Sequence, residues 1–276
     1  MTTRWQALAV GSETETPLWE LFHENSKLGR FSFGPSNKEV EDYTAGLLES
    51  LPFDGFPTIL LPKRLPAMKM PVGKAMQSRV SVRAMTPHAL RLDELAALLH
   101  YGYGVNRDKK RSGLLRSLRV VPSAGGLYPL EIFLHIANVK SLLPGLYHYN
   151  PLKHHLRRLR DGDHADEIAR CSVSDTIPQH AAVLIFLTAL FERSTFKYGN
   201  RGYRFALLEA GHVAQNINLV SSALGLGCLN MGGFFDREID AFLHLDGIGH
   251  STIYVLAVGM KSKYSSAGSK TSKRRC

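Results

Sequence analysis

Apolar residues follow a helical spacing in two parts of the chain. Within residues 92–99 they recur at intervals of three and four, and Gly102 and Gly104 then end the predicted helix. A longer apolar stripe runs through residues 204–224 and stops at Gly225. Because small or apolar residues also occupy other faces of this second helix, we expect it in a deep core or at a subunit interface.

Short apolar runs rich in Ile, Val and Phe predict buried strands of one sheet. These runs occupy residues 131–137, 181–187 and 252–258. A hairpin is predicted over residues 145–159, with its turn at Asn150-Pro151. The hairpin, the buried strands and the helices together indicate an α+β domain rather than a strict βαβ repeat.

The first 75 residues have a different pattern. Thr16-Pro17 is a suitable start for a short helix over residues 18–23. Prolines then recur through residues 51–71, and this spacing excludes a long helix or a central strand. The segment is therefore predicted to be an extended arm, which either clasps a partner subunit or straps its own chain.

Composition fits a compact protein, since 44% of the 276 residues are hydrophobic and 21% are charged. We expect an N-terminal extension and arm over residues 1–75, one domain over 76–260 and a tail over 261–276. The longest apolar run, residues 181–191, is too short to cross a bilayer. The beginning of the chain lacks the features of a secretory signal, so a cytoplasmic location without a membrane partner is expected.

Positive charge is concentrated at the end of the chain. The formal net charge is +10, and six Lys or Arg residues with no acidic residue lie in 261–276, so the rest carries 28 minus 24, or +4. This tail is predicted to be a disordered, solvated end, with a polyanion-binding arm as the alternative. Nucleic-acid binding ranks last among the functions, because the charge lies mainly in the tail without interleaved aromatic residues. Three cysteines without a CxxC spacing predict neither a disulfide framework nor a zinc site.

Arg79, Ser81 and Arg83 form the first candidate binding group. In an extended segment their side chains point the same way, because side chains alternate with a period of two. Guanidinium groups and a hydroxyl that converge suit a phosphate. A solvated basic strand has the same pattern, so a second part of a cofactor pocket is needed to decide between them.

The loop of residues 121–129, with the sequence Val-Pro-Ser-Ala-Gly-Gly-Leu-Tyr-Pro, is a candidate for that second part. Small residues bracketed by prolines let backbone amides approach a flat ring, although an ordinary Gly-Pro turn has the same composition. Residues 225–233 resemble GxGxxG but follow a helix, so they do not indicate a nicotinamide-binding Rossmann motif. Residues 191–204 are expected as a loop carrying Lys197-Tyr198, a pair that is either a general base with its neighbour or merely structural.

Several of these motifs occur together in one enzyme family. The Arg-x-Ser-x-Arg segment, the Pro-Ser-x-Gly-Gly-x-Tyr-Pro loop, Gly-Leu-Tyr-His-Tyr and, above all, Phe-Lys-Tyr-Gly-x-Arg-Gly-Tyr-Arg-Phe-x-Leu-x-Glu-x-Gly-His resemble the SagB-type, McbC-like dehydrogenases of the nitroreductase superfamily. The resemblance covers about residues 77–260, and residues 22–27 also resemble the family's N-terminal segment. These enzymes are FMN-dependent azoline oxidases, which convert thiazoline and oxazoline rings in modified peptides to thiazoles and oxazoles.

The resemblance implies a nitroreductase-like α+β fold, with an antiparallel or mixed central sheet flanked by helices. It also implies a homodimer joined through long core helices, with two FMN molecules at the subunit interface. The residues that match the positions for the FMN phosphate and ribityl chain are Arg79, Ser81 and Arg83, which Gly232, Gly233 and Lys261 complete. The residues that match the isoalloxazine positions are Pro122, Ser123, Ala124 and Gly125. The residues that match the catalytic pair are Lys197 and Tyr198.

Aromatising an azoline removes a proton from Cα and a hydride from Cβ. The hydride can go to flavin N5, and Tyr198 is the preferred base, with Lys197 favouring its phenolate; Lys197 as the base is the alternative. Dioxygen would reoxidise the flavin, and a cyclodehydratase is a candidate partner. Two other functions stay open: an NAD(P)H-dependent nitroreductase or quinone reductase of the same fold, and an oxidase of carrier-bound azolines on a nonribosomal synthetase.

Overall fold

The computed structural model describes residues 17–30, 34–86, 88–108 and 116–262. An eight-stranded sheet forms its centre, and a two-stranded sheet lies apart from it. The strands of the large sheet are β1 (Thr58–Leu60), β2 (Met85–Thr86), β5 (Leu130–Ile136), β6 (Gly145–Asn150), β7 (His155–Asp161), β8 (Val183–Leu190), β9 (Gly227–Met231) and β10 (His250–Lys261). The small sheet pairs β3 (Val105–Arg107) with β4 (Leu118–Arg119). Beyond Ser262, the predicted tail lies outside the described residues.

The strands of the large sheet have the order β1-β7-β6-β5-β8-β10-β2, and β9 also pairs with β10. All of these named strand pairs are antiparallel. The three apolar runs became β5, β8 and β10 of one sheet, as predicted, and β5 is buried along its whole length. The predicted hairpin is β6 and β7, and Asn150 Oδ1 fixes its turn by accepting hydrogen bonds from the backbone nitrogens of Leu152 and Lys153.

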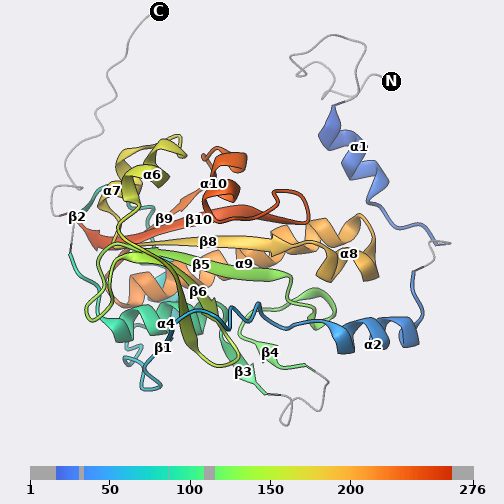
Figure 1. Ribbon diagram of the computed structural model, residues 1–276, viewed down its shortest axis with the longest axis horizontal. Helices are drawn as coiled ribbons and strands as arrows, with labels where there is room; N and C mark the ends of the chain where they lie inside the picture. Colours follow the sequence, from blue (N-terminus) through green and yellow to red (C-terminus); the bar gives the residue numbers. More distant parts are fainter. Residues whose placement is uncertain (1–16, 31–33, 87, 109–115, 263–276) are drawn as a thin grey trace, which may run out of the picture.

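Helices cover both faces of the sheet (Figure 1). One face carries α4 (Leu92–Tyr103) and α9 (Arg201–Ala223), and the other carries α6 (Ala165–Arg170), α7 (Thr176–His180) and α10 (Asp236–Phe242). Each face has its own apolar core, represented by Leu98 and Ile217 on the α4–α9 side and by Phe186 and Phe242 on the other. The predicted α+β class, with helices flanking an antiparallel sheet, is confirmed.

The helices α4 and α9 lie in close contact. A Cβ on Gly102 would lie 2.8 Å from Ile217 Cγ1, so the absence of a side chain lets the two helices approach. The prediction of a long helix over residues 204–224 is confirmed, with three more residues at its start. One side of α9 stays uncovered in a single chain, because Leu207 is 41% and Leu208 59% exposed.

The N-terminal section contains α1 (Leu18–Asn25), α2 (Asn37–Gly46) and α3 (Val72–Ser78). The short helix predicted from residue 18 is confirmed as α1. The arm is extended, as predicted, and it straps its own chain, since β1 pairs with β7 at the edge of the sheet. The helices α2 and α3 were not predicted, although Ser36 and Glu39 form a capping box at the start of α2, which is a signal that the sequence contains.

Residues 191–204 are not a loop, and that prediction is wrong. They form α8 (Glu192–Tyr198) and the first turn of α9, which Gly199 separates with a φ of 54°. A Cβ on Gly202 would lie 2.7 Å from the backbone of Ser194, so α8 packs tightly on α9. The buried Arg193 docks α8 through a long-range ion pair, which apolar periodicity does not reveal. Among the described helices, none has the length and apolar character needed to span a membrane.

Candidate functional site

Lys197 and Tyr198 meet the predicted ring-binding loop at Gly125. Both residues close α8, and both side chains are half-buried. A Cβ on Gly125 would lie 2.7 Å from Tyr198 Oη and 3.2 Å from Lys197 Nζ. The φ of Gly125 is 63°, a conformation that residues with side chains rarely adopt, so glycine is required on both counts. The structure therefore brings an amine and a phenol together over one backbone turn.

The turn itself presents little side chain to its surroundings. Pro122 and Gly125 are exposed, Ser123 and Ala124 are half-buried, and a short 3₁₀ turn covers residues 124–126. All four residues predicted to line a flat ring thus lie on one compact segment before β5. A segment of this kind can hold a planar group, because its own side chains are short and its backbone amides can approach the plane of that group closely.

Tyr128 closes the turn in a strained conformation. Its φ is 48°, which costs a residue other than glycine about 1 to 2 kcal/mol. Its backbone nitrogen donates to Ser123 Oγ at 2.9 Å, its hydroxyl accepts from the backbone nitrogen of Arg119 at 2.9 Å, and its carbonyl accepts from Arg193 Nη1 at 3.4 Å. These three contacts hold the strained residue in place, so the turn is a preformed element.

Glu209 lies beneath the turn, on α9. It is 2% exposed, accepts a hydrogen bond from the Tyr103 hydroxyl at 2.6 Å and is hydrogen-bonded to the hydroxyl of Ser123. Burial raises the pKa of Glu209 to about 7, although Ser123, Tyr103 and the nearby cations of Arg119 and Arg193 act in the opposite direction. Glu209 falls within the motif that carries the family resemblance, but the spacing of that motif predicts no role for it.

A second buried carboxylate, Glu131, fixes the position of α8. Its oxygens accept hydrogen bonds from Arg193 Nη2 and His148 Nε2, each at 2.7 Å, and from the backbone nitrogen of Leu51 at 3.0 Å. Burial alone would raise the pKa of Glu131, but the hydrogen bond with His148 and the charge of Arg193 lower it to about 2. The network joins the arm, the sheet and the helix that carries Lys197, and the sequence analysis missed it.

The predicted phosphate-binding residues lie along an extended segment beside β9. Val82 is buried and its backbone nitrogen donates to the Cys228 carbonyl at 3.0 Å, whereas Ser81 and Arg83 on either side are exposed. Arg79 is half-buried. Burial raises the pKa of the Cys228 thiol to about 12, and the positive charge of Arg79 opposes this rise. The predicted alternation is therefore seen over residues 81–83, whereas Val80 is 55% exposed and does not follow it.

Lys261 joins this segment from the end of β10. It pairs with Met85 in the sheet, and a Cβ on Gly227 would lie within 3.3 Å of both Val82 and Lys261. A cavity of about 200 Å³ adjoins Arg83 and is also lined by Thr176 and His180 of α7. Two basic segments from separate parts of the sequence thus lie next to each other in the sheet, and Arg83 lines the cavity beside them.

Gly232 and Gly233 do not join either group. The nearest atoms to a Cβ on Gly233 belong to Val173, in the connection between α6 and α7, and a Cβ on Gly232 would meet open space. The Gly233 carbonyl accepts a hydrogen bond from the backbone nitrogen of Val173 at 3.0 Å. Their role in a phosphate site stays a prediction.

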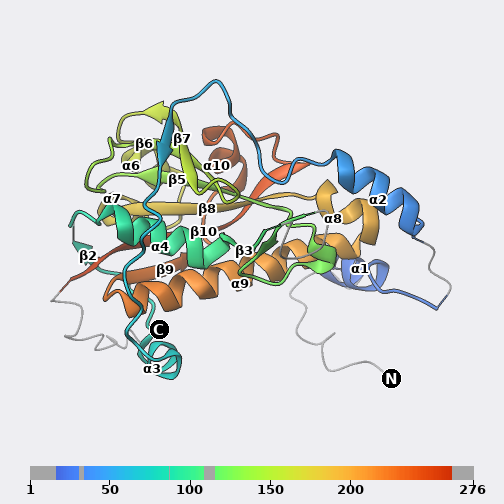
Figure 2. The ribbon, with the colours of Figure 1, turned by 90° about the horizontal axis from the view of Figure 1, so that it is seen from below.

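Helix α8, which carries Lys197, and strand β2, which follows Arg83, lie at opposite ends of the sheet (Figures 1 and 2). At one end, β8 leads into α8, and His250 of β10 pairs with Leu190. At the other end, Lys261 closes β10. The 12 residues of β10 span on the order of 35 Å at about 3.3 Å per residue.

The N-terminal extension packs at the α8 end. Tyr43 of α2 stacks on Phe196 with 4.0 Å between the ring centroids, and its hydroxyl donates to Glu192 at 2.8 Å. Phe22 of α1 contacts Tyr203 of α9 edge-on at 5.4 Å. The extension therefore contributes to the surroundings of Lys197 and Tyr198.

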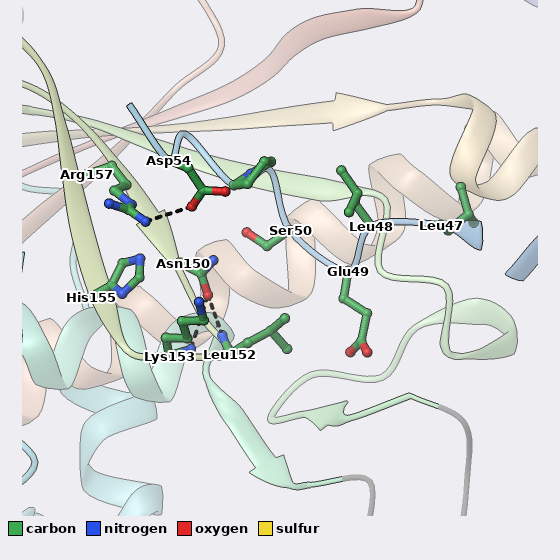
Figure 3. Close-up of a pocket in the computed structure, with 11 residues that line it drawn as sticks. Leu47, Leu48, Glu49, Ser50, Asp54, Asn150, Leu152, Lys153, His155 and Arg157 are labelled. Atoms are coloured by element: carbon green, nitrogen blue, oxygen red, sulfur yellow. Dashed lines mark hydrogen bonds and ion pairs between the residues drawn. The ribbon is translucent and has the colours of Figure 1, made fainter. Parts of the chain in front are cut away.

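A separate cavity of about 260 Å³ lies between the arm and the turn of the β6–β7 hairpin (Figure 3). Its lining mixes acidic Glu49 and Asp54 with basic Lys153 and Arg157, and Arg157 Nη2 lies 2.9 Å from Asp54 Oδ1. The cavity contains none of the predicted site residues. It therefore stands apart from the group around Gly125.

Comparison with known proteins gives one family. The family model described as Nitroreductase family matches residues 76–260. MJ1384 of Methanocaldococcus jannaschii, named as a nitroreductase, is 36% identical over 167 residues, which are 60% of this chain and 81% of that protein. The Escherichia coli microcin B17-processing protein McbC is 34% identical over 136 residues, 46% of this chain. The trifolitoxin-processing protein TfxB of Rhizobium leguminosarum is 28% identical over 189 residues, 64% of this chain. The matched parts span 49% of McbC and 49% of TfxB.

Solved structures agree with this family. A crystal structure from Anabaena variabilis, named as a nitroreductase, superposes with a TM-score of 0.72 at 26% identity, and covers 91% of this chain and 50% of that one. A chain of the E. coli microcin synthetase McbBCD complex with truncated pro-MccB17 bound superposes with a TM-score of 0.57 at 21% identity, over 88% of this chain and 92% of that one. The second likeness is one of fold.

Proposed function

Because the chain belongs to the nitroreductase family, a family of oxidoreductases, we propose that it is an FMN-dependent dehydrogenase that oxidises azoline rings of a modified peptide to azoles. The observation that carries the proposal is the meeting of Lys197 Nζ and Tyr198 Oη at Gly125, over a turn free of long side chains. The resemblance to the azoline oxidases rests on the same residues. The similarity to McbC, which is named for processing microcin B17, supports a peptide substrate.

The residues present fit FMN. The cradle of residues 122–125 suits the flat isoalloxazine, since it contains only small residues after Pro122, and Tyr198 and Lys197 approach it at Gly125. Arg79, Ser81, Arg83 and Lys261 supply the charge-assisted hydrogen bonds that a phosphate prefers. When bound, FMN supplies a hydride acceptor, and dioxygen reoxidises it.

Within one chain, the Gly125 turn and the cationic segment of residues 79–83 with Lys261 cannot both contact one FMN molecule. The length of β10 lies between them, and it exceeds the length of an extended FMN molecule. A twofold dimer resolves this separation. The 23 residues of α9 span about 35 Å and run from one group to the other, with Leu207 and Leu208 exposed along the way. Two α9 helices packed antiparallel about a twofold axis place the cationic segment of one chain beside the Gly125 turn of the other. We therefore propose a homodimer with two composite FMN sites.

The chain's own residues handle the proton. The azoline Cα–H bond breaks heterolytically, and Tyr198 Oη, which lies with Lys197 Nζ at Gly125, accepts the proton while the hydride leaves Cβ. The product has lost two hydrogens, one as the proton on Tyr198 and one as the hydride. Lys197 Nζ as the acceptor is the alternative assignment, since both atoms lie at the same turn. A cyclodehydratase that forms azolines is the partner class that would supply the substrate.

The test uses full-length protein and a synthetic thiazoline-containing peptide. Wild-type protein should purify with about one FMN per chain and remove 2 Da per ring. Lys197→Ala and Tyr198→Phe should keep FMN but lose about 10² to 10⁴ of the rate. The exposed Lys153→Ala is the matched control and should act as wild type. Absence of FMN from reconstituted protein would refute the cofactor, and wild-type rates in both variants would refute the roles of the pair.

One observation favours a second candidate function. MJ1384 matches over 81% of its length, more than McbC does, and is named as a nitroreductase. An NAD(P)H-dependent reductase of quinones or nitro compounds would use the same FMN site. Turnover of NADPH with a quinone, without oxidation of the thiazoline peptide, would select this alternative.

A further inference from the structure

Glu209 occupies an unusual position for a charged residue. It lies on the buried face of α9, between Ala206 and Val213, and both of these residues are fully buried. Buried carboxyl groups lower stability unless hydrogen bonds compensate for lost hydration. Here the compensation comes from two hydroxyls, those of Tyr103 and Ser123. An apolar residue would fill the same core position without needing these partners.

Of these two partners, Ser123 belongs to the candidate site. Its carbonyl accepts from the backbone nitrogen of Gly126 at 3.0 Å, and its hydroxyl oxygen accepts from the backbone nitrogen of Tyr128 at 2.9 Å. With both of these bonds on its oxygens, the hydroxyl proton of Ser123 remains to be donated to Glu209. Ser123 thus links the start of the turn, its end and the buried carboxyl.

The turn needs such a link. Gly125, Gly126 and Tyr128 all have left-handed backbone conformations, and a series of this kind persists only where its surroundings determine it. Tyr103 extends the support, because its hydroxyl accepts from the backbone nitrogen of Leu130 at 3.3 Å, at the start of β5. Glu209 therefore holds both the turn and the strand that follows it.

We propose that Glu209 is a positioning residue, which acts through Ser123 to hold the turn where Gly125 meets Lys197 and Tyr198. This inference rests on the proposed function, because the turn is the proposed cradle of FMN. Of the two contacts of Glu209, the bond with Ser123 is the one that reaches the turn, whereas Tyr103 contacts the strand after it. Loss of Glu209 should therefore matter only while Ser123 is present.

A double-mutant cycle on FMN affinity tests this prediction. Dissociation constants of FMN from apoprotein are measured by flavin fluorescence, and the visible spectrum of bound flavin is recorded. Ser123→Ala and Glu209→Leu should each weaken FMN binding about 10-fold and change the spectrum, and the double variant should bind no more than about 2-fold more weakly than Ser123→Ala. Glu209→Gln, which keeps an acceptor for Ser123, should restore most of the affinity.

Two further variants keep the result decisive. If Glu209→Leu does not fold, Glu209→Asp replaces it in the cycle, since it keeps the charge and shortens the reach to Ser123. The control is Glu94→Leu, at the opposite end of α4 from Tyr103, which removes another buried carboxylate and should leave FMN affinity unchanged. Additive effects of the Glu209 and Ser123 variants would overturn the proposal, while failure of the wild type to bind FMN would instead overturn the proposed function.

Discussion

Glu209 should make the stability of the protein depend on pH in a way that Glu209→Gln abolishes. The folded chain raises the pKa of this carboxyl from an ordinary 4.5 to about 7, because burial disfavours the charged form. A raised carboxyl pKa means that folding favours the protonated state. The cost is absent below pH 4.5, grows as the unfolded chain ionises and levels off above pH 7.

The magnitude follows from the size of the shift. Each pKa unit corresponds to 1.36 kcal/mol, so the shift of Glu209 amounts to a loss of stability on the order of 3 kcal/mol between pH 4 and pH 8. Glutamine has nearly the same shape and no charge to lose. The free energy of unfolding of wild type, relative to that of Glu209→Gln, should therefore fall by this amount across the range.

Urea unfolding at fixed protein and FMN concentration, in steps of pH from 4 to 8, measures the difference. Other titrating groups cancel between the two proteins, and a pH-independent offset from the substitution does not affect the slope. Tyr103, which donates a hydrogen bond to Glu209, keeps its proton over this range because burial raises its pKa well above 10. A difference that stays constant with pH would refute the assignment of a buried, proton-binding carboxyl.

Three other predictions concern the same region. Gly125→Ala should lower azoline oxidation about 100-fold with the fold intact, because its Cβ would displace the Tyr198 hydroxyl; unchanged turnover in the peptide mass assay would contradict this. Arg193→Met should cost about 3 to 5 kcal/mol in urea unfolding at pH 7, since it leaves Glu131 buried without its cation; a loss below about 1 kcal/mol would argue against the network. Leu208→Glu should yield monomers in sedimentation and release FMN, because a charge would enter the proposed interface; a dimer that retains flavin would show that α9 is not that interface.

The sequence was informative where apolar residues form a continuous run or a regular stripe. The apolar runs of β5 and β8 and the stripe of α9 all formed as predicted. Helix α8 has no such stripe. An ion pair between Arg193 and Glu131, which are 62 positions apart in the sequence, holds this helix in place instead. The Glu209 network was equally hidden, since Tyr103 lies 106 positions away from it.

The site shows the same limit. The resemblance assigned Gly125 to the flavin ring and Lys197 to catalysis, and the structure places Lys197 at the Gly125 turn. Nothing in the spacing of the motifs, however, indicated that Arg83 and Lys261 lie at the far end of the sheet. That distance depends on strand order and strand length, which only the assembled fold provides.

The location of the two groups at opposite ends of one chain has a genetic consequence. In the proposed dimer, a chain with Lys197→Ala keeps an intact cationic segment, and a chain with Arg83→Ala keeps an intact Gly125 turn. When the two defective chains are expressed together, each mixed dimer contains one site assembled wholly from sound parts and one that carries both lesions. Two inactive alleles should therefore complement each other in trans, with a ceiling of one working site in each mixed pair. Alleles that damage the same end should fail to complement.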